Sequence, residues 1–554
     1  MQPTFWHITD KQKTLLFFGF LAAYFVAAII NLGLLPLNGE EPRRALISIE
    51  MLQNGNYTAP TTMGWEYYNK PPIYNWILAL SMWLTGSTSE MAVRLPSLVF
   101  MVLWAISNFY IVRKLSSVTV AILSSVFFLT SFDIYFWGLN NGGEIDIFYG
   151  FIAYLQIASI FYFNHTRQWT KLYFWSGLLC AIGFLTKGFP SILFEGLTLL
   201  VVCIMDRSIR VLLKWQVLLG LLAFILPVGG YLLVYSNSGG NLNRFLINLL
   251  KESFNKSAIG EQAEKFIRKS IAYPFEFLKN LAPWSLFLLF LFQKRIRTEL
   301  FKNQLVRFSF LFILINILPY WFTGHPKMRY VYMFLPFAMI IIANIVMLLG
   351  EQYRQLVDKI LRWLIILFAG LLTGLIVLPF YKTVPVVSVV VGAVLLAVFI
   401  FLYWKAARPN LLLYFCAGIV LLRLVFSITF LPLRKDQMSL RYDKQMQAMA
   451  TANNNGPVTF YTKPNYLQLE IDMKVASFDF GAVPDIPYVA YQMPYYYYKA
   501  TGKVMLYDTL LNKGQSYIGL GSQVDSLSKQ TLYTYKDPNQ YNENVILFRL
   551  DNNQ

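Results

Sequence analysis

Charged side chains are scarce in this sequence of 554 residues, since Asp, Glu, Lys and Arg together make up 14% of it. Soluble domains carry about 25% charged residues. Hydrophobic residues reach 56%, and they occur in runs of about 18 or more, a length that crosses the hydrocarbon core of a bilayer. The composition therefore excludes a soluble protein and predicts a polytopic α-helical membrane protein.

Cysteine is also rare. The three cysteines, Cys180, Cys203 and Cys416, all lie in apolar stretches, so they cannot form the disulfide framework of an exterior domain. Basic residues outnumber acidic ones and give a formal net charge of +18. Because they are spread over many loops, we attribute the charge to membrane orientation and to contact with anionic membrane lipids, and we expect no nucleic-acid partner.

The apolar runs predict about 13 membrane spans. The first, over residues 14–36, is too long for the apolar region of a signal peptide and is expected to stay uncleaved. With the N-terminus inside, the cytoplasmic loops hold about 19 Lys and Arg in roughly 70 residues, against about 15 in well over 100 outside. This bias predicts an exterior C-terminus. Span centres are expected near residues 25, 104, 128, 156, 178, 197, 226, 286, 315, 340, 371, 394 and 421.

The chain divides into two predicted parts. Residues 1–435 form a membrane module with long exterior loops at 38–92 and 237–280, and loops of that length are more often functional than mere connections. Residues 436–554 are polar and contain short β-like runs, which predict a small soluble α/β domain outside the membrane. These runs are PVTFYT, KVMLYD, YIGLG and NVILFRL.

The segment NGEEPRRALISIEMLQNG in the first exterior loop predicts a helix that starts at Pro42 and lies in the membrane interface. Its acids Glu40 and Glu41 come at the positive helix end, and Arg43 and Arg44 follow directly. This brings two carboxylates and two guanidiniums together at the membrane surface. The alternative is a helix cap with local ion pairs from Glu40 to the two arginines.

Two further exterior segments carry charges at the ends of predicted helices. Lys70 directly precedes a Pro-Pro pair that opens a helix, so it can bind an anion or, alternatively, a lipid phosphate at the interface. Glu144 and Asp146 stand at the junction into the fourth span, where ionisable groups usually line a cavity. The alternative is that these carboxylates simply remain in the head-group zone.

A fourth exterior segment, GHPKMRYVYMFLP, contains His325, Lys327, Arg329 and Tyr330 between the ninth and tenth spans. Basic residues on the outer side run against the charge bias of the loops. A phosphate group is the simplest ligand that would favour them there.

Several motifs in this order and spacing resemble the bacterial GT-C glycosyltransferases of the protein O-mannosyltransferase superfamily, and most closely the lipid A aminoarabinose transferases. The motifs are GEEPRRAL, EMLQNGNYTAP, YYNKPPIYNW, GEID, FLTKGFP and HPKMRY, and they cover most of residues 38–340. The resemblance implies a GT-C fold in the bacterial inner membrane, with a periplasmic C-terminal domain. It also implies a donor sugar linked to polyprenyl phosphate.

The resemblance also assigns roles to residues. The carboxylates of the family fall on Glu40, Glu41 and Asp146, which become the catalytic candidates. The cations and polar groups expected to hold the lipid phosphate are Arg43, Lys70, Lys256, His325, Lys327, Arg329 and Tyr330.

The sequence departs from the family pattern at four positions. Glu40 replaces an aspartate, which keeps the charge but lengthens the side chain by one methylene. Asn69 and Ser253 stand where the relatives have a Glu and a His that resemble a metal pair, and neither is a strong metal ligand. We therefore expect no cofactor and no tightly bound divalent metal. Arg44 replaces an aromatic residue, a change expected to alter the pocket for the sugar or the acceptor.

These observations predict an inverting glycosyltransferase that moves a sugar from a polyprenyl-phosphate donor to a membrane-associated or periplasmic acceptor. The acceptor can be lipid A, a protein or a surface glycan. A transporter or flippase of lipid-linked glycans is the alternative, but such proteins usually have repeated halves and charges near mid-membrane. A non-catalytic membrane scaffold and an oligosaccharide ligase or polymerase also remain open.

Overall fold

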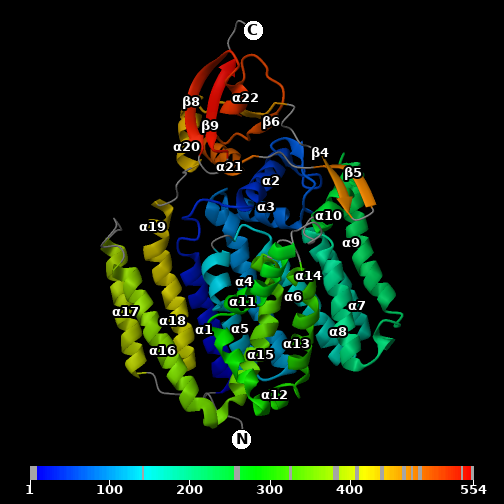
Figure 1. The fold of residues 1–554 in the computed structure, drawn as a ribbon, viewed down its shortest axis with the longest axis vertical. Coiled ribbons are helices and arrows are strands. Elements are labelled where there is room, and N and C mark those ends of the chain that lie inside the picture. The colour runs from blue at the N-terminus through cyan, green and yellow to red at the C-terminus, as the bar shows by residue number, and fades with distance from the viewer. Residues whose placement is uncertain are drawn as a thin grey trace.

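Long helices make up most of the molecule, and a small sheet lies at one end of it (Figure 1). The computed structural model describes residues 9–139, 142–254, 263–322, 327–377, 386–405, 411–436, 442–463, 470–475, 478–484, 489–537 and 541–550.

Eight helical segments in the described ranges are long and apolar enough to cross a membrane. A ninth span can be built from α11 (Ala263–Asn280) and the helical turns at Trp284–Phe292, which meet at an angle of 116°. The chain is therefore a multi-pass membrane protein, as predicted. The eight are α1 (Asp10–Ile29), α4 (Glu90–Leu115), α6 (Asp146–His165), α9 (Val217–Asn237), α13 with α14 (Gln304–Trp321), α15 with the turns before it (Met328–Leu348), most of α16 (Gln355–Val377), and α18 through α19 to Arg434 (Leu411–Arg434).

Each of the 13 expected span centres lies in a helical segment, and four of these segments are not among the spans counted above in the described residues. Helix α5 has 12 residues and is buried along its whole length. At 1.5 Å per residue it extends only about 18 Å, against a hydrocarbon core of about 30 Å. Eight or nine spans pass by length and hydropathy among the described residues, and the full number of about 13 stays a prediction. The four helices are α5 (Val118–Leu129), α7 (Trp169–Lys187), α8 (Pro190–Asp206) and α17 (Val386–Lys405).

The first exterior loop folds into two helices, α2 (Glu41–Asn54) and α3 (Ile73–Thr85), joined by the two-residue strands β1 (Thr61–Thr62) and β2 (Trp65–Glu66). Helix α2 ends where predicted, at Gly55, which takes the left-handed conformation with φ 67°. Residues 41–51 are all buried, because α3, β1 and α21 (Gln492–Thr501) pack around them. Protein therefore covers this part of the helix on all sides.

A five-stranded sheet forms the C-terminal cap, which we define as the described residues from 442 to 550. The strand order is β6-β3-β7-β9-β8, with β3 parallel to β6 and β7, and β9 antiparallel to β7 and β8. The four predicted β-like runs correspond to β3, β6, β7 and β9. The elements are α20 (Tyr442–Ala452), β3 (Thr459–Tyr461), β6 (Leu506–Asp508), β7 (Ser516–Leu520), α22 (Gly521–Val524), β8 (Lys529–Asp537) and β9 (Glu543–Leu550).

The edge strand β8 and the antiparallel hairpin of β4 (Glu470–Val475) and β5 (Phe478–Pro484) were not predicted from the sequence. In Figure 1 this hairpin lies beside α10 (Leu242–Phe254), away from the main sheet. The remaining short helices are the turns at Asp133–Gly138, Ile209–Val211 and Phe426–Phe430, and α12 (Lys294–Leu300).

The cap is fixed to the membrane helices through α21. The Tyr496 hydroxyl accepts a hydrogen bond from the Leu37 backbone N–H at 2.9 Å and donates one to Glu90 at 3.2 Å. The Lys499 ammonium pairs with the same Glu90 at 2.5 Å. One continuous buried apolar cluster runs from the membrane helices into the cap. Helices α2 and α3 are thus held between the two, where the predicted site residues lie (Figure 1).

Candidate active site

Glu40 stands at the start of α2, as its N-cap residue. Its carboxylate pairs with the guanidinium of Arg43, one turn further on, and 42% of its side chain is exposed. The local ion pair considered from the sequence is therefore present for Arg43. Glu40 is the most accessible of the predicted carboxylates.

Glu41 is fully buried and forms a two-point ion pair with Arg94 from α4. The Arg94 Nε and Nη2 atoms each lie 2.8 Å from one carboxylate oxygen. Backbone N–H groups of Asn38 and Gly143 donate to the same carboxylate at 3.0 and 2.9 Å. The remaining Arg94 nitrogen contacts are to the carbonyls that lead into α2, at Leu32, Leu35 and Pro36. This pair anchors the start of α2 to α4.

Arg94 was not among the predicted site residues. The sequence did contain an indication of it, since Arg94 is a lone arginine inside an apolar run. Such a residue usually pairs with a buried group of opposite charge. The predicted catalytic role of Glu41 stays a prediction, but its four donors occupy both oxygens.

A second charged group gathers where α6 begins. Asp146, the first residue of α6, pairs with Lys187 at 2.5 Å and lies 3.2 Å from Nε of Arg329. Glu144, two residues earlier, pairs with the same Arg329. The ammonium of Lys187 also lies over the rings of Tyr149 and Tyr330, at 4.9 and 4.5 Å from their centroids. Lys187, from the FLTKGFP motif, was not assigned a role from the sequence.

These groups border a cavity of about 410 Å³. It brings together residues from the fourth and tenth predicted spans and from the turn at Asp133–Gly138. Asp133 accepts a hydrogen bond from the Tyr332 hydroxyl at 3.3 Å. The lining residues are Asp133, Trp137, Gly138, Glu144, Asp146, Ile147, Lys327, Met328, Arg329 and Tyr332.

The start of α2 adjoins this cavity. A Cβ atom added to Gly39 would lie 3.0 Å from a carboxylate oxygen of Glu144, and one added to Gly143 would lie 3.1 Å from Cβ of Glu41. Gly39 has a φ of 59°, a left-handed conformation that glycine adopts freely. The two acidic segments predicted from the sequence are therefore neighbours in space.

Burial raises the pKa of Glu144 from its usual 4.5 to about 7, and the nearby Asp146 and Glu41 add to the rise. The guanidinium of Arg329 acts in the opposite direction. A carboxyl group with a pKa near 7 changes its charge at the pH at which most cells work. Its state also decides whether Arg329 has one carboxylate partner or two.

Arg43 and Arg44 both contact the ring of Tyr67, with guanidinium carbons 5.9 and 5.6 Å from its centroid. Arg43 also lies 5.6 Å from the ring of Tyr491 in the cap. Lys70 is buried, with 8% of its surface exposed, and it stands directly before the residues that open α3. The three cations thus lie between the membrane helices and the cap.

Two predicted phosphate ligands, Lys256 and His325, lie outside the described residues. Lys327 and Arg329 line the cavity, and Tyr330 covers Lys187. Among the described residues, no group of three or more His, Cys, Asp or Glu side chains could hold a metal ion.

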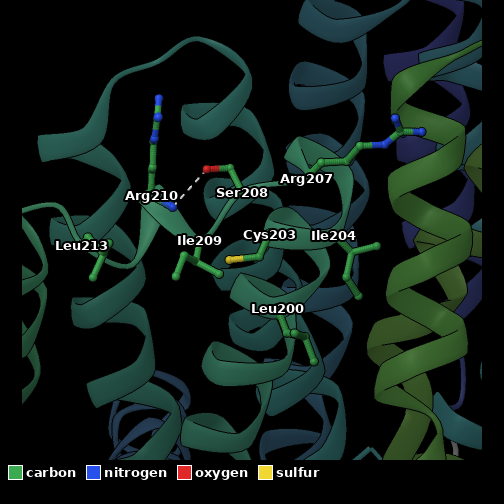
Figure 2. Close-up of a pocket in the computed structure, with 8 residues that line it drawn as sticks. All are labelled: Leu200, Cys203, Ile204, Arg207, Ser208, Ile209, Arg210 and Leu213. Carbon is green, nitrogen blue, oxygen red and sulfur yellow. Dashed lines mark hydrogen bonds between the residues drawn. The ribbon is translucent and has the colours of Figure 1, made fainter.

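A separate hollow of about 700 Å³ lies at the other end of α8 (Figure 2). It is lined by apolar side chains with Arg207 and Arg210. Helix α8 has 17 residues, so about 25 Å separates this hollow from the Lys187 end of the helix. It shares no residue with the cavity beside Asp146 and is not part of the site.

Comparison with known proteins finds a family match within the first half of the chain. Residues 69–231 match the family described as dolichyl-phosphate-mannose-protein mannosyltransferase. An undecaprenyl phosphate-alpha-4-amino-4-deoxy-L-arabinose arabinosyl transferase of Pectobacterium atrosepticum is 32% identical over 207 residues, 35% of this chain and 36% of that protein. A homologue from Sodalis glossinidius is 30% identical over 228 residues, 38% of each chain. The chain thus spans little more than a third of the curated relatives it matches.

The fold likeness extends over nearly the whole chain. The crystal structure of ArnT from Cupriavidus metallidurans bound to undecaprenyl phosphate matches with a TM-score of 0.65, covering 95% of this chain and 97% of that one at 14% identity. The same protein in the apo state matches with a TM-score of 0.63. The resemblance predicted from the exterior motifs is therefore confirmed: the chain is similar in sequence to bacterial aminoarabinose transferases over 207 to 228 residues, and it has the GT-C fold.

Proposed function

We propose that this protein is an inverting glycosyltransferase that moves a sugar from a polyprenyl-phosphate donor to a hydroxyl acceptor. The observation that carries the proposal is the cavity beside α2, where buried carboxylates and cations meet between the membrane helices and the cap. The names of the sequence relatives, which specify undecaprenyl phosphate and an arabinosyl transfer, support the same reaction. So does a fold shared with a protein crystallised with undecaprenyl phosphate.

The donor phosphate needs cations at the membrane surface. We assign this role to Lys70, Arg43 and Lys327, together with Arg329 and Tyr330 and, outside the described residues, Lys256 and His325. Cations fixed around the departing phosphate stabilise the charge that develops as the glycosidic bond breaks. Since polyprenyl phosphate is already a good leaving group, the reaction needs no general acid.

The acceptor hydroxyl needs a base. The hydroxyl oxygen bonds to the anomeric carbon, its proton passes to a carboxylate, and the bond from that carbon to the phosphate oxygen breaks. Glu40 is our first candidate, because it is accessible and has one cationic partner, Arg43, among the described residues. Asp146 is held by both Lys187 and Arg329, an arrangement that suits orientation of the acceptor. Because Glu41 is fully engaged by Arg94, we assign it a positioning role.

We further propose that the protein lies in the bacterial inner membrane and works on its periplasmic side. Residues 1–435 would form the catalytic membrane module and residues 436–554 the periplasmic domain. The acceptor would be lipid A, a protein or a surface glycan that reaches the cavity from outside, while the donor enters from the membrane.

A transfer assay tests the proposal. The purified full chain in lipid nanodiscs is incubated with polyprenyl-phosphate sugars that carry a radiolabel on the sugar, together with candidate acceptors. We expect labelled acceptor and an equal amount of free polyprenyl phosphate, both lost in Asp146→Asn and retained in Arg210→Gln, a change to an exposed arginine at the distant hollow. Movement of intact donor across the membrane without bond cleavage would instead indicate a flippase.

A further inference from the structure

Arg44 is a buried cation for which the described part of the chain supplies no anion. Only 2% of its surface is exposed. Its Nε and Nη1 atoms have no hydrogen-bond partner among the described residues. The neighbouring carboxylates are already engaged, Glu40 by Arg43 and Glu41 by Arg94.

An isolated buried charge is costly, since leaving one uncompensated weakens a protein by several kcal/mol. Arg94 shows the usual solution in the same protein, because it is equally buried and pairs with Glu41 through two nitrogens. A guanidinium at this depth that has no carboxylate partner among the described residues points to an anion that arrives with a ligand.

The groups around Arg44 share the same lack of partners. The guanidiniums of Arg43 and Arg44 lie 5.9 and 5.6 Å from the Tyr67 ring centroid. The Tyr67 hydroxyl and Nε of Arg43 are buried without a hydrogen-bond partner among the described residues. The Ser48 hydroxyl lies 3.0 Å from the backbone carbonyls of both Arg44 and Asn75, which brings the backbones of α2 and α3 together at these two residues. Both polar atoms of the Asn75 amide are buried and unpartnered in the described chain. We call Arg43, Arg44, Tyr67 and Asn75 the Arg44 pocket.

We propose that the Arg44 pocket binds an anionic substituent, a carboxylate or a phosphate, on the sugar that is transferred. This inference rests on the proposed function and names the class of donor within it. An arginine fork binds a planar oxoanion through two parallel hydrogen bonds. The Tyr67 hydroxyl and the Asn75 amide can donate further hydrogen bonds to the same group.

The distance along α2 fits this assignment. Arg44 follows the base candidate Glu40 by four residues, which is about 6 Å along the helix. That spacing is comparable to the breadth of one hexose ring. A sugar whose anomeric carbon lies near Glu40 could therefore present a substituent on its far side to Arg44.

The charge of the Arg44 pocket also predicts which donor sugars bind poorly. An amino sugar would bring a second cation next to Arg44, and like charges at close range repel. A neutral sugar would leave the guanidinium buried and unpaired. Because the donor lipid carries a phosphate of its own, the test must separate that anion from one on the sugar.

The test measures binding of three lipids to the full chain in nanodiscs: undecaprenyl phosphate, undecaprenyl-phosphoryl glucuronate and undecaprenyl-phosphoryl glucose. We expect the wild type to bind the glucuronate lipid at least tenfold more tightly than the glucose lipid. Arg44→Gln is expected to abolish this preference while its affinity for undecaprenyl phosphate stays within about threefold of wild type. Arg210→Gln, the matched control far from the site, is expected to keep the preference.

Two results would overturn the inference. In the first, the wild type binds both sugar lipids equally. In the second, Arg44→Gln weakens all three lipids by the same factor, which would assign Arg44 to the lipid phosphate.

If Arg44→Gln does not fold, Arg44→Lys keeps the charge and removes the fork, and a reduced preference is expected.

A lipid-free arm separates this inference from the proposed function. Sodium glucuronate is expected to raise the melting temperature of the wild type more than glucose with matched sodium chloride does. Equal effects of the two sugars would count against the pocket. If no undecaprenyl lipid binds at all, the proposed function fails, whereas protection by glucuronate that Arg44→Gln loses would still uphold the anion site.

Discussion

At the scale of single residues, the proposed phosphate site predicts that loss of either of two cations weakens donor binding. Lys70 and Arg43 are buried cations between the cap and the membrane helices. We expect Lys70→Ala and Arg43→Ala each to weaken donor use by at least tenfold, about 1.4 kcal/mol, the low end for a charge-assisted contact. Binding of undecaprenyl phosphate to the folded variants measures this, and unchanged affinity in both would reject the phosphate assignment.

The base can be identified by isosteric changes that remove charge. Glu40→Gln is expected to lower turnover by roughly 10²–10⁴-fold, the usual contribution of a general base, with donor affinity near wild type. Asp146→Asn is expected to lower turnover as well, because it releases Lys187 and Arg329. Single-turnover kinetics with labelled donor provide the measurement. Normal turnover in Glu40→Gln with an inactive Asp146→Asn would exchange the two roles.

The raised pKa of Glu144 predicts that the rate of sugar transfer depends on pH. Burial raises its pKa to about 7, so below that pH it is neutral and its pair with Arg329 loses one charge. We expect transfer to rise as pH increases through about 7, and Glu144→Gln to flatten this limb of the profile. The effect on folding stability has the opposite sign. Because the pKa of Glu144 is raised in the folded protein, the protonated form stabilises the fold, and this contribution decreases as the pH rises and is lost above about pH 7.

At the scale of elements, the Glu41–Arg94 pair fixes the start of α2 onto α4. Arg94→Met leaves Glu41 buried and unpaired, and we expect a loss of about 3–5 kcal/mol of folding stability. The double change Glu41→Met with Arg94→Met should recover part of it, since a well-packed apolar pair can replace a buried ion pair. Thermal unfolding in detergent measures both, and equal stability of the single and double variants would contradict the anchoring role.

The elements that bear the site were predictable because their signals are local. Pro42 and Gly55 bound α2, the Pro-Pro pair opens α3, and Asp146 begins α6, as expected from neighbouring residues alone. The sequence also indicated cations near these carboxylates. Strand β8 escaped prediction because its residues, KQTLYTYKD, alternate polar and aromatic side chains without an apolar run.

The pairings within the site were not predictable, because they join residues far apart in the chain. Lys187 reaches Asp146 across 41 residues and Arg94 reaches Glu41 across 53. No spacing rule connects such positions. The full span number stays a prediction for a related reason: α5 is buried along its whole length, and hydropathy alone cannot distinguish burial in protein from burial in lipid.

At the scale of the whole molecule, the site depends on the cap lying outside. The cap and α12 lie at opposite ends of the molecule (Figure 1). α12 belongs to a loop that the Lys and Arg bias assigns to the cytoplasm. Helix α21 closes over α2, so the cavity and the cap must face the same side of the membrane.

Reporter fusions test this arrangement directly. A fusion after Arg434 should be active only with a reporter that works outside the cytoplasm. A fusion in the turn at Ile209–Val211, which lies at the far end of α8, should be active only with a cytoplasmic reporter. The two fusions are informative together because their expected signals are opposite. A failure of expression would remove a signal from both reporters and could not produce this pattern. A cytoplasmic signal after Arg434 would put the carboxylates, the cations and the cap on the side away from exterior acceptors, and the proposed reaction could not occur there.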